Sequence, residues 1–156
     1  MSTPFELDAR LAGDTLVVGD LALCRVLLMR DSRYAWLVLV PRRAALVEVS
    51  DLPDDERALL WLEVDAAGTA LRTIAPCDKL NIGALGNIVR QLHVHVVARR
   101  EGDAAWPGPV WGFGKAEAYA AGEAESIAER IRQDLGILSS KAELFQGRTL
   151  PGQNCG

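Results

Sequence analysis

Three apolar segments lie close together near the start of the chain, and their spacing restricts how the chain can fold. They span residues 15–20 (TLVVGD), 21–29 (LALCRVLLM) and 35–41 (AWLVLVP), with turns at Gly-Asp and at RDSRY. Runs of Val, Leu and aromatic residues between such turns are typical of strands. Because turns this short leave no room for a crossover helix, neighbouring strands must run antiparallel. We therefore predict an antiparallel sheet that begins near residue 15.

Two longer segments have apolar residues at the three- and four-residue spacing of a helix with one buried face. The first covers 50–75, with Ser50 or Asp51 as its N-cap. Its predicted buried residues are Leu60, Val64, Ala67, Leu71 and Ile74. The second covers about 115–135 and ends at Gly136. Its predicted buried residues are Ala120, Ala124, Ile127, Ile131 and Leu135.

Three shorter segments complete the predicted elements. Leu7 and Leu11 lie four residues apart and indicate a short helix over 4–12 that ends at Gly13. The segments CDKLNIG and RQLHVHVVARR are apolar enough to form two further strands. The sequence therefore predicts both strands and helices, and the predicted helices lie before or after the three closely spaced strands in the chain.

The composition is that of one globular domain. The chain has 156 residues, 49% of them hydrophobic, and we predict one domain over 1–138 and a mobile tail over 139–156. A net charge of −4 argues against nucleic acid as the main ligand. No signal sequence is recognisable, and the apolar stretch AWLVLV is too short to span a membrane. The scattered Cys24, Cys77 and Cys155 favour reduced thiols in a cytoplasmic protein.

The only two histidines of the chain lie one residue apart in RQLHVHVVARR. Alternate side chains of a strand point to opposite faces, so one face would carry Gln91, His93 and His95. The other face would carry residues for the core: Leu92, Val94 and Val96. Three interpretations remain open at this point. The polar face could be an exposed surface, a metal site completed by acidic residues or a distant cysteine, or a catalytic site that uses a neutral imidazole.

A glycine-containing turn, NIGALGN, directly precedes the histidine segment. Gly83 and Gly86 permit close approach of the backbone, so that N–H groups could surround a phosphate beside His93. A small anionic ligand is compatible with the negative total charge because basic residues such as Arg90 lie nearby. These features favour the catalytic interpretation with a phosphate-bearing ligand.

The segment GNIVRQLHVHVVAR resembles the motif of the histidine triad (HIT) family of nucleotide hydrolases and transferases, in which three histidines alternate with apolar residues along a strand. The similarity extends back through NIG and forward to WPGPVWG, and covers roughly residues 15–136. It implies an α+β fold. An antiparallel sheet of about five strands would carry a long helix packed on one face and a C-terminal helix. It also implies a homodimer.

The resemblance implies covalent catalysis without a cofactor or a metal ion. The middle histidine of the motif attacks the α-phosphate of a nucleotide, and water or another acceptor then resolves the nucleotidyl-histidine. Matched by position, His93 is the nucleophile, His95 is the third histidine and Gln91 stands in the first position. The substrates implied are dinucleoside polyphosphates or nucleoside phosphoramidates. Near pH 7 an unperturbed histidine is largely neutral, so a nitrogen lone pair is available for attack.

The same resemblance assigns the residues that would bind the nucleotide. The residues assigned to phosphate binding lie in and beside the glycine-containing turn and are Asn81, Gly83, Gly86 and Asn87. Ribose binding falls to Asp31 in the RDSRY turn. Together with the histidines, these residues form the predicted site.

Three positions depart from the family pattern. Gln91 replaces the first histidine, Ile88 stands where many members carry a hydroxyl residue, and Trp36 stands where a further histidine often occurs. Glutamine cannot titrate and isoleucine cannot donate a hydrogen bond. Each lost proton-transfer group typically lowers a rate by about 10²–10⁴-fold. The alternative function is therefore a nucleotide-binding protein with little or no turnover.

Several large side chains lie outside this motif. Trp61 and Leu62 fall off the buried face of the predicted helix, which is compatible with a dimer interface. Arg99 and Arg100 follow the histidine segment, and we interpret both as a solvated rim. Trp111 could cap the site or only hold its loop in place.

Overall fold

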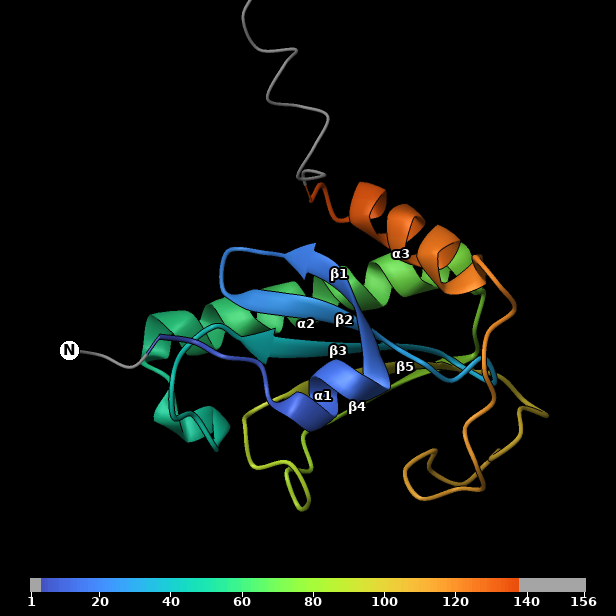
Figure 1. The fold of residues 1–156 in the computed structure, drawn as a ribbon, viewed down its shortest axis with the longest axis horizontal. Coiled ribbons are helices and arrows are strands. Elements are labelled where there is room, and N and C mark those ends of the chain that lie inside the picture. The colour runs from blue at the N-terminus through green and yellow to red at the C-terminus, as the bar shows by residue number, and fades with distance from the viewer. Residues whose placement is uncertain (1–3, 138–156) are drawn as a thin grey trace, which may run out of the picture.

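A five-stranded antiparallel sheet forms the centre of the protein, in a computed structural model that describes residues 4–137 (Figure 1). The strand order is β1-β2-β3-β5-β4, and each neighbouring pair is antiparallel. The strands are β1 (Thr15–Asp20), β2 (Cys24–Met29), β3 (Ala35–Pro41), β4 (Lys79–Gly83) and β5 (Val94–Arg99). The predicted α+β fold is confirmed, whereas the predicted tail over 139–156 lies outside the described residues.

Two helices cover one face of the sheet (Figure 1). They are α2 (Asp54–Ile74) and α3 (Glu123–Asp134). The predicted buried face of α2 is confirmed for four residues in the core, Leu60, Val64, Ala67 and Leu71, while the fifth, Ile74, is only partly buried. They pack with strand residues that include Val26, Leu37, Leu39, Val94 and Val96. Among the helices of residues 4–137, none has the length and apolar character needed to cross a membrane.

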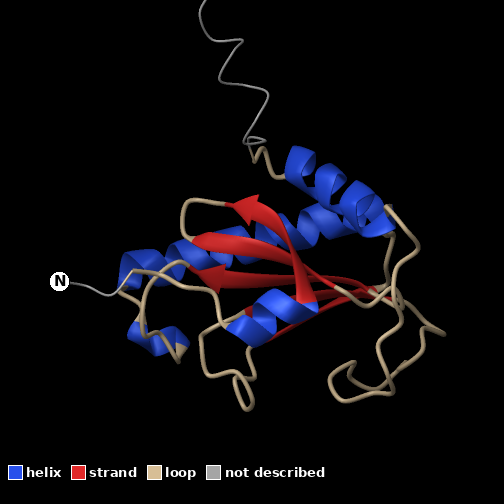
Figure 2. Cartoon of the chain, viewed as in Figure 1, coloured by secondary structure: helices blue, strands red, loops and turns tan. Residues whose placement is uncertain are grey.

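The opposite face of the sheet carries helix α1 (Ala9–Asp14) and long loops (Figure 2). A second, smaller core lies here, formed by buried residues that include Leu11, Trp36, Val38, Val40 and Val97. Because β-strand side chains alternate, this face also receives His95, two residues from Val97. The histidines therefore lie on the loop-covered face, away from α2 and α3.

The predicted starts of the two shorter helices are wrong. The first helix begins at Ala9 instead of residue 4, and the Asp8 side chain caps it by accepting the N–H of Arg10 (2.8 Å). The last begins at Glu123 instead of about residue 115. Residues 115–120 are not helical because their backbone binds elsewhere: the carbonyl of Glu117 accepts the N–H of Ser32 (2.8 Å). Ala120, predicted to be buried, is consequently exposed.

The N-cap predicted for the long helix is also wrong. The carboxylate of Asp51 does not cap α2 but accepts the N–H groups of two preceding residues, Val47 (3.1 Å) and Glu48 (2.8 Å). A short 3₁₀ turn, Val49–Asp51, results, and α2 begins only after Pro53. Proline has no N–H and fits the beginning of a helix, where that group would have no partner.

A buried carboxylate joins α2 to the sheet. The two oxygens of Glu63 accept the backbone N–H groups of Leu23 and Cys24, each at 2.8 Å. Burial and the neighbouring Glu63 raise the pKa of the Cys24 thiol, which therefore stays protonated. No local sequence pattern predicts this role of Glu63, because its two partners lie about forty residues away in the sequence.

Candidate functional site

The first histidine of the site, His93, lies in the last position of the loop that connects β4 to β5, and it is buried. Its Nδ1 lies 2.6 Å from the carbonyl oxygen of Gln91. A carbonyl can only accept, so Nδ1 must carry the ring proton. The neutral ring then has its lone pair on Nε2, the atom that could act as a nucleophile.

The second histidine, His95, lies in β5 opposite Val38 of β3 and Gly83 of β4. Its ring is 4.9 Å from that of His93, measured between centroids, so the two side chains share one side of the sheet. Burial, followed by the proximity of His93, lowers the pKa of His95 to about 3. His95 is therefore neutral at pH 7. The N–H of Trp36 donates to its Nδ1 at 3.0 Å.

The side chain of Gln91 holds the N-terminal segment and is hydrogen-bonded to neither His93 nor His95. Its Oε1 accepts the N–H of Asp8 (2.9 Å), and its Nε2 donates to the carbonyl of Glu6 (2.8 Å). The oxygen and the nitrogen of the Gln91 amide are thus both hydrogen-bonded to the segment that leads into α1. The structure therefore places His93 and His95 together, whereas the Gln91 side chain is bound by the N-terminal segment and only its carbonyl contacts His93.

A cavity of about 270 Å³ borders His93 on the side of the glycine-containing loop. Gly86 and Asn87, both predicted to bind phosphate, line it together with Arg90. Gly86 has φ +68°, a conformation that favours glycine over residues with a side chain. Replacing Gly86 with a residue that has a side chain would therefore strain the loop. Ile88, next to this wall, is 77% exposed.

The other two predicted phosphate-binding residues are already in contact with side chains. Gly83 lies under Trp111, and a Cβ added to it would be 3.3 Å from the indole ring. The Oδ1 of Asn81 accepts a hydrogen bond from Arg99 (2.8 Å). Trp111 therefore covers the site face, with its ring centroid 5.6 Å from that of His95.

The prediction that Arg99 is part of a solvated rim is wrong. Its side chain is 1% exposed and pairs with the buried carboxylate of Asp103 at 2.7 Å and 2.9 Å. Its guanidinium also lies over the rings of Tyr34 and Trp106. Arg99 belongs to the same sheet face as His95 and connects β5 to β4 through Asn81. Only Arg100 is exposed, as predicted.

Asp31 is buried, with its carboxylate bound to Arg33 through both oxygens (2.9 Å and 2.8 Å). It also accepts the N–H of Glu117 at 3.3 Å. Burial acts to raise its pKa, but the hydrogen bonds from Arg33 and the backbone prevail and lower it. Asp31 is therefore ionised, and it helps to hold the segment before α3. It lines a cavity of about 350 Å³ together with Trp36.

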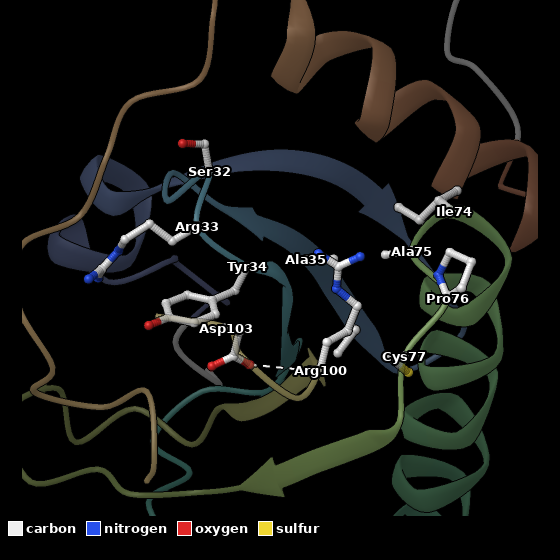
Figure 3. Close-up of a pocket in the computed structure, with 11 residues that line it drawn as sticks. Ser32, Arg33, Tyr34, Ala35, Ile74, Ala75, Pro76, Cys77, Arg100 and Asp103 are labelled. Atoms are coloured by element: carbon white, nitrogen blue, oxygen red, sulfur yellow. Dashed lines mark hydrogen bonds between the residues drawn. The ribbon is translucent and has the colours of Figure 1, made fainter. Parts of the chain in front are cut away.

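Another cavity, of about 400 Å³, lies near the end of β5 that is far from His93 (Figure 3). Tyr34, Cys77 and Arg100 are among the residues around it, and the carboxylate of Asp103 accepts the backbone N–H of Arg100 at 3.2 Å. Neither histidine lines this cavity. It is therefore separate from the candidate catalytic site. Within residues 4–137, no three His, Cys, Asp or Glu side chains are grouped so that they could hold a metal ion.

Comparisons with known proteins agree with the observed fold. The HIT domain model matches residues 11–102. The crystal structure of a histidine triad protein from Bradyrhizobium japonicum is 47% identical, with 85% of this chain and 99% of that chain covered and a TM-score of 0.83. A histidine triad protein from Sinorhizobium meliloti is 52% identical, with 83% and 96% covered and a TM-score of 0.81.

A third structure, a histidine triad protein from Marinobacter aquaeolei, is 39% identical and has a TM-score of 0.83, with 88% of this chain and 100% of that chain covered. A search of curated proteins finds no match. The family model covers more than half of the chain, and the solved structures share both its sequence and its fold. The chain therefore belongs to the histidine triad (HIT) family, whose members are in general nucleotide-binding hydrolases and transferases.

Proposed function

We propose that this protein is a nucleotide hydrolase or nucleotidyl transferase that acts through a covalent nucleotidyl-histidine at His93. The observation that carries the proposal is the 2.6 Å contact between Nδ1 of His93 and the Gln91 carbonyl. It directs the ring lone pair to Nε2, as a nucleophile requires. Dinucleoside polyphosphates and nucleoside phosphoramidates are the proposed substrate classes.

The reaction has two steps. Nε2 of His93 forms a bond to the α-phosphorus, while the bond from phosphorus to the leaving oxygen or nitrogen breaks and its electron pair departs. Water or another acceptor then attacks the phosphorus, the phosphorus–nitrogen bond breaks, and the lone pair returns to His93. The leaving oxygen or nitrogen takes up a proton from solvent in the first step, and the attacking acceptor releases a proton to solvent in the second, so protons balance over the two steps. His95 would donate its Nε2–H to a phosphate oxygen and stabilise the charge that develops there.

The surrounding residues have separate proposed roles. Gly86 and Asn87 would hold phosphate oxygens, because they share a cavity with His93. Gly83 and Asn81 would complete the phosphate site from β4. Asp31 would contact the ribose, since it lines the cavity beside Trp36. We place the reaction in the cytoplasm, where free thiols such as those of Cys24 and Cys77 are usual.

The alternative is a protein that binds nucleotides and turns them over slowly or not at all. It is favoured by the side chain of Gln91, which holds the N-terminal segment and supplies no titratable group to the site. Incubation with adenosine and guanosine phosphoramidates and dinucleoside polyphosphates separates the two functions. Release of nucleoside monophosphate supports the enzyme. Saturable binding without release would support the alternative, and neither binding nor release would contradict both.

We also propose that the protein is a homodimer joined along β4. This strand is at the edge of the sheet, and its Ile82 is 47% exposed. Trp61, 48% exposed, lies seven residues before Gly68 and hence on the same side of α2. Gly68 packs against Leu80 of β4, so Trp61 and Ile82 flank one edge. Light scattering should give about twice the 16.9 kDa chain mass at micromolar concentration. A mass equal to one chain would contradict the dimer.

A further inference from the structure

Trp36 lies next to His95 on the site face of the sheet. β3 and β5 pair so that Trp36 is opposite Val97 and Val38 is opposite His95. The indole ring is tilted by 60° to the imidazole, with centroids 5.5 Å apart, and its Nε1 lies 3.0 Å from Nδ1 of His95. Both side chains are buried, so water does not compete readily for this hydrogen bond.

The direction of this hydrogen bond determines where the His95 proton lies. An indole N–H can donate but cannot accept, so Nδ1 of His95 must supply the lone pair. A neutral imidazole then carries its proton on Nε2. At His93 the Gln91 carbonyl has the opposite effect, because it accepts from Nδ1 and leaves the lone pair on Nε2. The two rings are therefore held in opposite tautomers.

We infer that Trp36 is a positioning residue that holds the proton of His95 on Nε2, so that His95 presents a hydrogen-bond donor beside the nucleophilic Nε2 of His93. This inference rests on the proposed reaction at His93 and extends it to a residue outside the histidine motif. The transferring phosphate would then meet one lone pair and one N–H from two adjacent rings. A His95 ring in the other tautomer would present a second lone pair and repel the phosphate oxygen.

The burial of His95 supports this role. Its lowered pKa keeps the ring neutral at pH 7, so the position of a single proton decides whether Nε2 donates or accepts. Trp111 lies close to the same ring, with centroids 5.6 Å apart. However, its Nε1 is buried and has no hydrogen-bond partner within the described part of the chain. Trp111 therefore shares the packing of Trp36 but not its hydrogen bond, and it provides a matched control.

Nitrogen-15 NMR of the imidazole rings tests the inference without any substrate. The sequence contains only two histidines, so the full-length untagged protein gives only two ring systems to assign. At pH 7 we expect His93 to carry its proton on Nδ1 and His95 to carry its proton on Nε2. The Nδ1 resonance of His95 should also show the shift of a lone pair that accepts a hydrogen bond. A wild-type His95 with its proton on Nδ1 would overturn the inference.

Two variants separate the hydrogen bond from the packing. Trp36→Phe should remove the hydrogen-bond shift of His95 Nδ1 and allow the proton to exchange between the ring nitrogens. Trp111→Phe should leave both features as in the wild type. With an active substrate, Trp36→Phe should lower kcat by about 10- to 100-fold with little change in KM, because the donor is misplaced in the transition state.

An unchanged His95 spectrum in Trp36→Phe, or the same loss in Trp111→Phe, would contradict the role of Trp36. The result is distinguishable from a failure of the proposed function. If the two tautomers are as expected but no substrate reacts at His93, the proposed function is wrong while the hydrogen bond from Trp36 to His95 stands. If an adduct forms at His93 but His95 has the other tautomer, only the inference is wrong.

Discussion

Replacing His93 with alanine is expected to abolish turnover, with a fall in kcat of at least about 10⁴-fold. The variant loses the lone pair on Nε2 of His93, the proposed nucleophile, and His95 does not replace it because the hydrogen bond from Trp36 leaves its proton on Nε2. Nucleoside monophosphate release from the best substrate of the panel is the measurement. The His93→Ala protein should keep its thermal unfolding temperature within a few degrees if the loss is chemical.

His95→Ala is the matched comparison. It removes the proposed hydrogen-bond donor to the phosphate and leaves the proposed nucleophile, so kcat should fall by only about 10²–10³-fold. The residual turnover should therefore exceed that of His93→Ala. If His93→Ala keeps the wild-type kcat, or if His95→Ala is the more severe variant, the proposed roles of the two histidines are wrong.

The largest expected effect on stability follows removal of the carboxylate of Asp103. In Asp103→Ala the guanidinium of Arg99, which is 1% exposed, stays buried without its ionic partner. Breaking one side of a buried pair typically costs about 3–5 kcal/mol, so the free energy of unfolding should fall by that amount. Urea unfolding followed by tryptophan fluorescence measures it.

Asp54→Ala is the control, because its ion pair with Arg57 is exposed to solvent. Exposed pairs contribute about 0–1 kcal/mol, so this variant should unfold almost as the wild type does.

The hydrogen bonds from Arg99 lower the pKa of Asp103. The stabilisation is thus present above the ordinary carboxyl pKa of about 4 and is lost as the pH falls through the lower folded-state pKa. An equal fall in the free energy of unfolding in Asp103→Ala and Asp54→Ala would contradict the expected contribution of the buried ion pair.

Local patterns predicted the strands more closely than the starts of the helices. The apolar segments 15–20 and 35–41 match β1 and β3 in full, because short turns and β-rich composition act within a few residues. The first and last helices begin later than predicted because distant groups hold the preceding backbone in another conformation. Gln91 binds the backbone of Glu6 and Asp8 across more than eighty residues of sequence, which no local pattern reports.

The sequence predicts only part of the candidate site, again because local patterns do not report contacts between residues that are distant in sequence. The motif pointed to His93 and His95, and the structure places their rings together on one side of the sheet. The hydrogen bond from Trp36 to His95 joins residues 59 positions apart, and it depends on the pairing of β3 with β5. The burial of Arg99 is not predicted by the sequence, because a charged residue at a strand end is usually exposed and its partners come together only in the folded chain.

The central claim is that His93 forms the covalent intermediate, and direct detection of that intermediate tests it. A slowly reacting nucleoside phosphoramidate or dinucleoside polyphosphate is mixed with the wild-type protein, and the reaction is stopped without acid, which would hydrolyse a phosphorus–nitrogen bond. Peptide mass spectrometry should then find one nucleoside monophosphate group on His93 and none in the His93→Ala protein. An adduct on His95, or steady release of nucleoside monophosphate from His93→Ala, would contradict the claim.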